Sequence, residues 1–154
     1  MMRRSLFLVG DDYPNYVAMK GTLKDIGNLN YLRSEWAFRT ILEGMKNGIG
    51  IPDLLIFEEA LAWKKNTSLK VEVPPEVTEG GPKRAGIRSY TGLREAEKSL
   101  GIVTPVVLIL QDSTSIDSVL SELRKTQDPR DLQVIHLTDP CYINLHKAVY
   151  RALK

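Results

Sequence analysis

Carboxylate residues that follow two short apolar segments are the residues best placed to do chemistry. Glu58 and Glu59 come directly after the apolar run 54–57, and Asp11 and Asp12 follow the run 5–9. Unbroken apolar runs of this length are typical of strands that are covered on both faces, as in a parallel sheet. Ligands and reactions collect at the carboxyl ends of such strands. Glu58 is therefore the residue whose role has to be explained.

The segments that must position these carboxylates alternate between strand and helix. Hydrophobic runs predict strands at residues 5–9, 29–33, 53–58, 105–110 and 132–137. Helical spacing of apolar residues, with helix start and stop residues around it, predicts helices that begin near residues 14, 34, 91, 114 and 143. Strands that alternate with helices in this way form a five-stranded parallel sheet with right-handed crossovers and helices on both faces. We therefore expect a three-layer α/β fold.

Composition suits a single domain over residues 1–154. The chain is 43% hydrophobic and 26% charged, which is enough to bury a substantial core. Its 21 basic and 19 acidic residues nearly balance, so nothing indicates a nucleic-acid or membrane partner. The single Cys141 cannot form an internal disulfide, and the first apolar run is too short for a signal peptide or membrane span. We expect a cytoplasmic protein.

Residues 61–87 break the alternation and are expected to form an insertion that starts beside Glu58 and Glu59. A segment of this length without structure is unusual in a compact domain unless it is functional or partly ordered. Residues 68–73 alternate in polarity and suit a short extra strand. The segment is either a tolerated surface insertion or a flap over the carboxylates.

The order and spacing of these elements resemble the receiver domain of bacterial response regulators, the CheY-like domains. The acidic pair after the first strand, the acid that ends the third strand and the proline after the fifth strand carry the resemblance, which covers almost the whole chain outside the insertion. Residues 85–88 also look like a variant subgroup of receivers. The resemblance implies a flavodoxin-like, doubly wound (βα)5 sheet.

The resemblance also assigns roles to individual positions. Glu58 lies at the position of the phosphorylatable aspartate, while Gly10 and Asp11 lie on the acidic pair that holds magnesium. The other matches are Leu110 on the threonine or serine that ends the fourth strand, His136 on the switch residue, and Asp139 on the lysine after the fifth strand.

Three groups that carry out phosphoryl transfer in the family are thus replaced. A divalent ion and a lysine must offset the charge that builds around the incoming phosphate. Here the lysine is an acid, the hydroxyl is a leucine, and Glu58 is one methylene longer than aspartate. We expect an atypical receiver of the two-component signalling type that is not an enzyme and that docks protein partners without phosphorylation. Glu58 then either has a structural role or permanently imitates a phosphorylated aspartate. The structural role is favoured, since one carboxylate mimics a phosphate poorly.

Two alternatives stay open. The chain is a working phospho-accepting receiver if Asp11, Asp12 or Glu59 takes a role that the alignment misplaces. It is a small magnesium-dependent, flavodoxin-like hydrolase if the acidic end has a general base and a closed pocket, neither of which the sequence displays. A homodimer through the helix after residue 114 and the fifth strand, as receivers often form, is also open.

An acidic pocket at one end of the sheet needs compensating charge, because like charges at short range are costly. The residues expected to share this pocket are Asp11, Asp12, Glu58, Glu59 and Asp139. Either the first three of them hold Mg²⁺ or Ca²⁺ as oxygen ligands, or Lys64 and Lys65 fold back from the insertion, or solvent screens the charges. The loss of one acid to Gly10 favours the lysines or solvent, so no cofactor is required.

Overall fold

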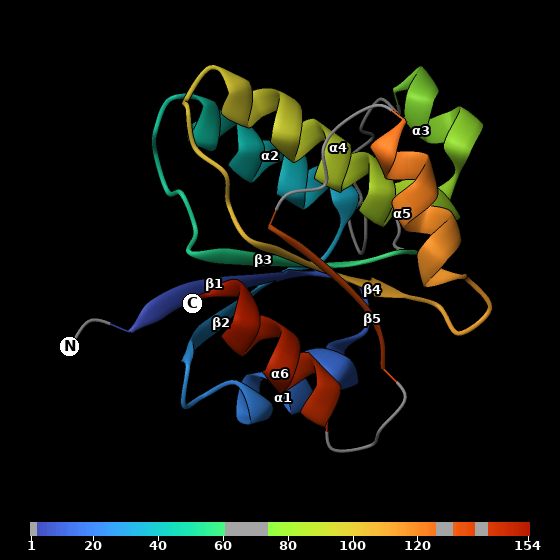
Figure 1. Ribbon diagram of the computed structural model, residues 1–154. Helices are drawn as coiled ribbons and strands as arrows, with labels where there is room; N and C mark the ends of the chain where they lie inside the picture. The colour runs from blue at the N-terminus through green and yellow to red at the C-terminus, as the bar shows by residue number, and fades with distance from the viewer. Residues whose placement is uncertain (1–2, 61–73, 126–130, 138–141) are drawn as a thin grey trace.

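A computed structural model describes residues 3–60, 74–125, 131–137 and 142–154, and these form a three-layer α/β fold (Figure 1). Five parallel strands make one sheet in the order β2-β1-β3-β4-β5, which confirms the expected architecture. The elements are β1 Arg4–Val9, α1 Tyr13–Thr22, β2 Gly27–Leu32, α2 Glu35–Lys46, β3 Leu54–Glu58, α3 Pro75–Gly80, the 3-10 helix η1 Pro82–Arg84, α4 Ala85–Lys98, β4 Val106–Leu110, α5 Ile116–Arg124, β5 Leu132–His136 and α6 Ile143–Ala152.

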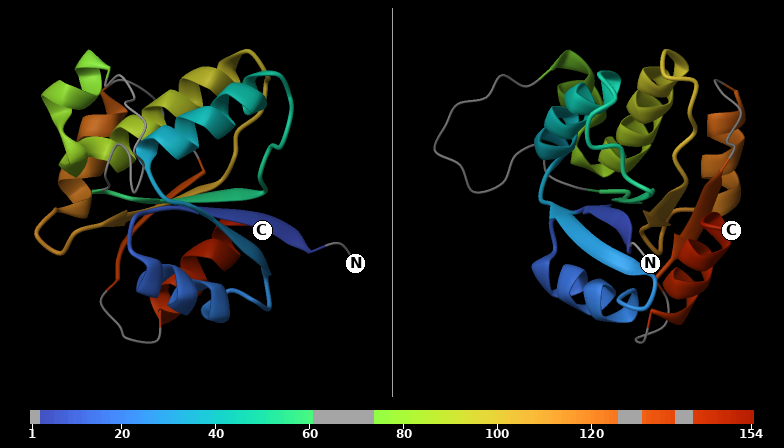
Figure 2. Two further views of the ribbon diagram at one scale, coloured as in Figure 1. Left: turned by 180° about the vertical axis from the view of Figure 1, so that it is seen from behind. Right: turned by 90° about the vertical axis from the view of Figure 1, so that its left-hand side faces the viewer.

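Helices cover both faces of the sheet. Helices α1 and α6 lie on one face, and α2, α3, α4 and α5 lie on the other (Figures 1 and 2). The central strands are therefore buried on both sides: residues 54–57 are 0% exposed, and no residue from 106 to 110 is more than 6% exposed. This double burial explains their unbroken apolar sequences. In the described part of the chain, no helix has the length and apolar character that crossing a membrane requires.

Alternate side chains of β3 divide between two hydrophobic cores. Leu55 and Phe57 pack under α2, α4 and α5, whereas Leu54 and Ile56 pack under α1 and α6. Phe57 meets Phe38 of α2 edge to face, with 4.9 Å between the ring centroids. The two cores fix β3 from both sides, and the position of Glu58 at its end is fixed with it.

Strand register brings the ends of the strands to one edge. Val9 of β1 lies opposite Phe57, Glu58 lies opposite Ile109, and Leu110 lies opposite His136. The residues that follow each strand therefore meet at the carboxyl edge of the sheet, as expected for parallel strands.

Two predicted boundaries are wrong. Val17, Leu23 and Ile26 recur at helical spacing and predict a first helix that stops at Gly27, but α1 ends at Thr22 because the chain turns early to enter β2 at Gly27. The helix expected from residue 91 begins at Ala85, so residues 85–87 belong to α4 rather than to the insertion. Its start carries no side-chain cap, and η1 leads directly into it, which leaves the sequence without a helix start signal. Residues 61–73, including the strand predicted at 68–73, lie outside the described residues.

The first turn of α4 lies against the end of β3. The Gly86 amide donates a hydrogen bond to the Glu59 carbonyl at 2.8 Å. A Cβ atom at Gly86 would overlap the Glu58 carbonyl and would lie 2.8 Å from the Glu59 Cα. Only glycine lets the helix approach this closely, and the approach holds the backbone of Glu58 and Glu59 in place.

We predict that Gly86→Ala lowers the free energy of unfolding by about 1–3 kcal/mol, because backbone must move to admit the methyl group. Gly92→Ala in the same helix is the matched control. Its Cβ would make only an ordinary contact, 3.8 Å from Leu42 Cδ2, and alanine is favoured over glycine in helices by about 1 kcal/mol. Urea denaturation measures both variants. Equal effects would show that the approach of α4 to β3 is not a constraint.

Candidate functional site at the carboxyl edge of the sheet

A small cavity of about 190 Å³ opens at the carboxyl edge of the sheet. Its walls come from the ends of β3, β4 and β5 and from the first turn of α1. The lining residues are Asn15, Glu58, Glu59, Ala60, Ile109, Leu110, Gln111, Asp112 and Leu137. The structure thus gathers Glu58, Glu59 and Leu110 at one site, where the sequence placed them.

The Glu58 side chain lies directly against Gly10. A Cβ atom at Gly10 would lie 2.7 Å from both Cδ and Oε1 of Glu58 and 3.0 Å from Oε2. Such distances are too short for real contacts, so the Glu58 carboxylate occupies the space that any side chain at position 10 would need. The glycine and the longer acid fit each other, and the Gly10 amide is held by the Leu32 carbonyl at 3.0 Å.

The two aspartates after β1 serve this edge differently. The exposed Asp12 is the N-cap of α1, and its Oδ1 accepts a hydrogen bond from the Asn15 amide at 3.1 Å. Burial, followed by the charges of Glu58, Asp11 and Asp12, raises the pKa of Tyr31, and Arg33 opposes this shift. Together the carboxylates therefore produce a negative potential at the edge of the sheet.

Two of the same carboxylates act on a second tyrosine, Tyr142, at the start of α6. Burial raises the pKa of Tyr142, and the charges of Asp12 and Glu58 add to that effect. The Tyr142 hydroxyl also donates a hydrogen bond to Asn15 Oδ1 at 2.7 Å, which ties the start of α6 to α1.

The residues at this edge do not fit a magnesium site. Among the described residues, no three His, Cys, Asp or Glu side chains are grouped so as to hold a metal ion. The candidate ligands Asp11, Asp12 and Glu58 are among the described residues and are not grouped in this way. Asp12 is used to cap α1, Glu58 packs over Gly10, and glycine itself offers no side-chain ligand.

Glu59 faces the loop between β4 and α5 and is only 7% exposed. Its Oε1 accepts a hydrogen bond from the Gln111 amide at 2.8 Å, and its Oε2 accepts one from Thr114 Oγ1 at 2.9 Å. It shares the cavity with Glu58, but its charge is used to hold this loop rather than left for a ligand.

The two positions matched to switch residues are both packed into the structure. Leu110 is 3% exposed and closes the core at the end of β4. His136 is half-buried, and its Nε2 donates a hydrogen bond to the Thr114 carbonyl at 2.7 Å. Thr114 is thus held on one side by Glu59 and on the other by His136.

Three predicted site residues cannot be placed, and two contacts at the site were not predicted from the sequence. Lys64, Lys65 and Asp139 lie outside the described residues, so their roles stay predictions. The sequence did not reveal Thr114 as a partner of Glu59, because a helix start signal at Thr114 suggested a cap; the actual N-cap of α5 is Ser115. In the sequence, Gly10 and Glu58 appeared only as two separate departures from the receiver pattern. The sequence did not show that the Glu58 carboxylate fills the space beside Gly10.

Structural comparison identifies the fold. No protein-family model matches the sequence, and no curated protein matches it. The receiver domain of a histidine kinase from Arabidopsis thaliana, bound to Mg²⁺ and BeF₃⁻, is similar over 98% of this chain and 91% of its own, with 17% identity and a TM-score of 0.61. The BeF₃-activated receiver domain of DrrB is similar over 99% and 98%, with 16% identity and a TM-score of 0.59.

A response regulator receiver protein from Sinorhizobium medicae gives the same result, with 15% identity, a TM-score of 0.60, and coverage of 98% of this chain and 94% of its own. The chain has the receiver-domain fold. At such low identity the receiver likeness extends to the fold and not to the chemistry, so the carboxyl edge has to be judged on its own residues.

The contact between Gly10 and Glu58 makes a testable prediction. Gly10→Ala should lower the free energy of unfolding by about 1–2 kcal/mol, because the Glu58 carboxylate must move. In a Glu58→Ala background the same change should cost nearly nothing, so a double-mutant cycle gives a coupling of about 1 kcal/mol.

Gly27→Ala is the control for this cycle. A Cβ atom there would overlap the backbone carbonyl of Arg4. Arg4 and Gly27 pair at the start of β1 and β2, whereas Glu58 lies at the end of β3. Its cost should be the same with or without Glu58. Additive effects of Gly10→Ala and Glu58→Ala in urea denaturation would contradict the proposed fit.

Proposed function

We propose that this chain is an atypical receiver domain that works as a phosphorylation-independent protein-interaction module of the two-component signalling type. One observation carries the proposal: the Glu58 carboxylate stands in the space of a side chain at position 10. One carboxylate thus takes the place of two acids in the receiver pattern, the phosphate acceptor and the first metal ligand.

The surrounding residues support an inert site. Phosphoryl transfer requires positive charge around the transferred group. Leu110 supplies no hydroxyl and is almost fully buried, and the sequence places Asp139 where the receiver pattern has lysine. A phosphate at this edge would be repelled by the carboxylates. The hydroxyl and the lysine that would stabilise it in the receiver pattern are replaced by Leu110 and Asp139.

The loop after β4 supports a fixed rather than a switchable conformation. Glu59 holds Thr114 by its hydroxyl, and His136 holds it by its carbonyl. Both contacts exist without any added charge at Glu58. A module with this arrangement presents one surface to its partners at all times, and those partners are proteins. A homodimer contact through α5 and β5 is one use that we propose for this surface.

Incubation with acetyl phosphate and Mg²⁺, followed by intact-mass measurement, tests this function. We predict no covalent phosphoryl addition, and no change in the amide shifts of Gly10, Glu58 or Thr114 on addition of beryllofluoride. A phosphorylatable receiver domain treated in the same buffer is the positive control.

The variants Glu58→Gln and Glu59→Gln decide the meaning of any positive result. Phosphoryl addition to the wild-type chain that is lost in one of them would make the chain a working receiver and overturn the proposal. Release of inorganic phosphate without covalent addition would instead favour the magnesium-dependent hydrolase.

A further inference from the structure

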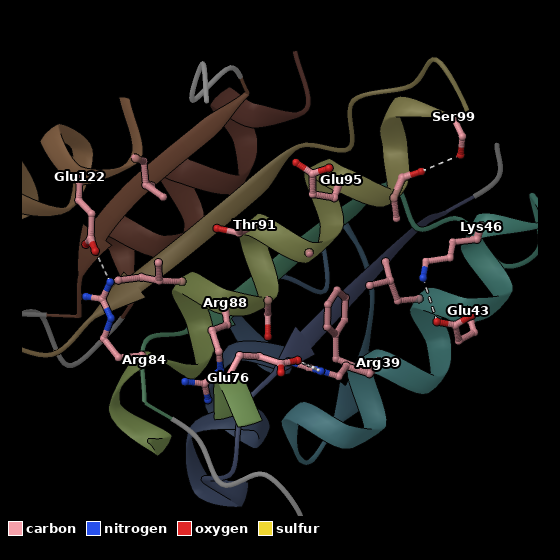
Figure 3. Close-up of a pocket in the computed structure, with 17 residues that line it drawn as sticks. Arg39, Glu43, Lys46, Glu76, Arg84, Arg88, Thr91, Glu95, Ser99 and Glu122 are labelled. Carbon is pink, nitrogen blue, oxygen red and sulfur yellow. Dashed lines mark hydrogen bonds and ion pairs between the residues drawn. The ribbon is translucent and has the colours of Figure 1, made fainter. Parts of the chain in front are cut away.

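A second and larger concavity lies on the opposite side of α4 from the sheet. It has a volume of about 860 Å³ and runs between α2 and α4, with α3, η1 and α5 along its sides (Figure 3). Its position on the helical face separates it from the carboxylates described above. We call it the α2–α4 groove.

The segment between β3 and α4 closes one side of this groove. Glu76 of α3 forms an ion pair with Arg39 of α2 at 3.0 Å, and Arg84 of η1 pairs with Glu122 of α5 (Figure 3). The two pairs join the extra helical turns to the helices on either side. Residues of α3 and η1 thus line the groove beside α2 and α4. A site bounded in this way suits a small molecule better than a long partner helix.

The charges that line the groove cancel. Four cations, Arg39, Lys46, Arg84 and Arg88, face four acids, Glu43, Glu76, Glu95 and Glu122. Each of the cations already has an acidic partner, including Lys46 with Glu43 at 3.0 Å and Arg88 with the buried Glu35 at 2.6 Å. A charged ligand would gain no net attraction and would have to compete with these pairs. The lining therefore favours an uncharged ligand.

Part of the lining of the groove is apolar, and there is room beside Gly92. Phe38 and Leu42 come from α2, and Ile87 comes from α4. Gly92 also lines the groove, and a Cβ atom there would have only Leu42 Cδ2 within 4 Å, at 3.8 Å. Ser89, also part of the lining and 4% exposed, has a hydroxyl with no hydrogen-bond partner among the described residues.

We propose that the α2–α4 groove binds an uncharged, mainly apolar small molecule that carries a hydrogen-bond acceptor. Small-molecule sites have volumes of about 300–1,000 Å³, an apolar lining and a few polar groups. The groove has this size and this lining, and Ser89 Oγ and Arg88 Nη1 are buried donors in it without a hydrogen-bond partner among the described residues. The proposal does not depend on whether Glu58 accepts phosphate.

Displacement of a neutral dye by matched ligands tests both the site and its preference for charge. Nile red is titrated with the protein and then displaced by 1-decanol, decanoate or decylammonium, each below its aggregation limit. We expect saturable dye binding, and we expect decanol to displace the dye at concentrations at least tenfold lower than either charged ligand. Equal or stronger displacement by a charged ligand would overturn the inference about charge.

Two glycine variants locate the binding. Gly92→Met adds a long side chain to the lining of the groove and should weaken dye binding at least tenfold. Gly21→Met is the control, because Gly21 lies in α1 on the other face of the sheet with nothing within 4 Å of its added Cβ. Thermal unfolding and amide spectra confirm that both variants are folded.

The outcomes separate the possibilities. Loss of binding in Gly92→Met with wild-type binding in Gly21→Met, and decanol-induced amide shifts confined to α2 and α4, support the groove. No saturable binding to the wild-type chain, or equal binding by both variants, overturns it. A groove that rejects decanol but binds a helical peptide would be a protein-docking surface, which also contradicts the proposal.

Discussion

The contact between the Glu58 carboxylate and Gly10 limits what the carboxyl edge of the sheet can do. Strands β1 and β3 are paired with Val9 opposite Phe57, so the next residue of each strand meets the other directly. A side chain at position 10 would displace the Glu58 carboxylate from the place that it occupies here. The longer acid at position 58 and the glycine at position 10 therefore fit each other in this structure.

Other contacts extend this constraint to the loops around it. Gly86 brings α4 against the backbone of Glu58 and Glu59, and Glu59 reaches across to Thr114. His136 completes the arrangement from β5. These contacts pair Glu59, Thr114 and His136 with one another within the chain. A loop held in this way agrees with the proposed interaction module, which keeps the receiver architecture and presents a fixed surface.

The sheet could be predicted from the sequence because strands that are buried on both faces have unbroken apolar sequences. Residues 54–57 and 106–110 are apolar without interruption, and the acids after them located the candidate site. Contacts between residues far apart in the chain produce no such local sequence pattern. Glu35 and Arg88 form a buried, bidentate ion pair 53 positions apart, and no local pattern links them. The same is true of Glu59 with Thr114, and of the α2–α4 groove, whose lining comes from α2, α3, η1, α4 and α5. Helix boundaries failed where tertiary contact, and not a capping residue, sets the first turn, as at Ala85.

A magnesium titration followed by amide shifts and calorimetry tests the central claim most directly, because a receiver site that can act on phosphate must first hold its cation. We predict no saturable binding at micromolar concentrations and no localised shifts at Gly10, Asp11 or Glu58. Saturable micromolar binding, with shifts centred on these three residues, would show that Glu58 leaves the space over Gly10 and would contradict the account.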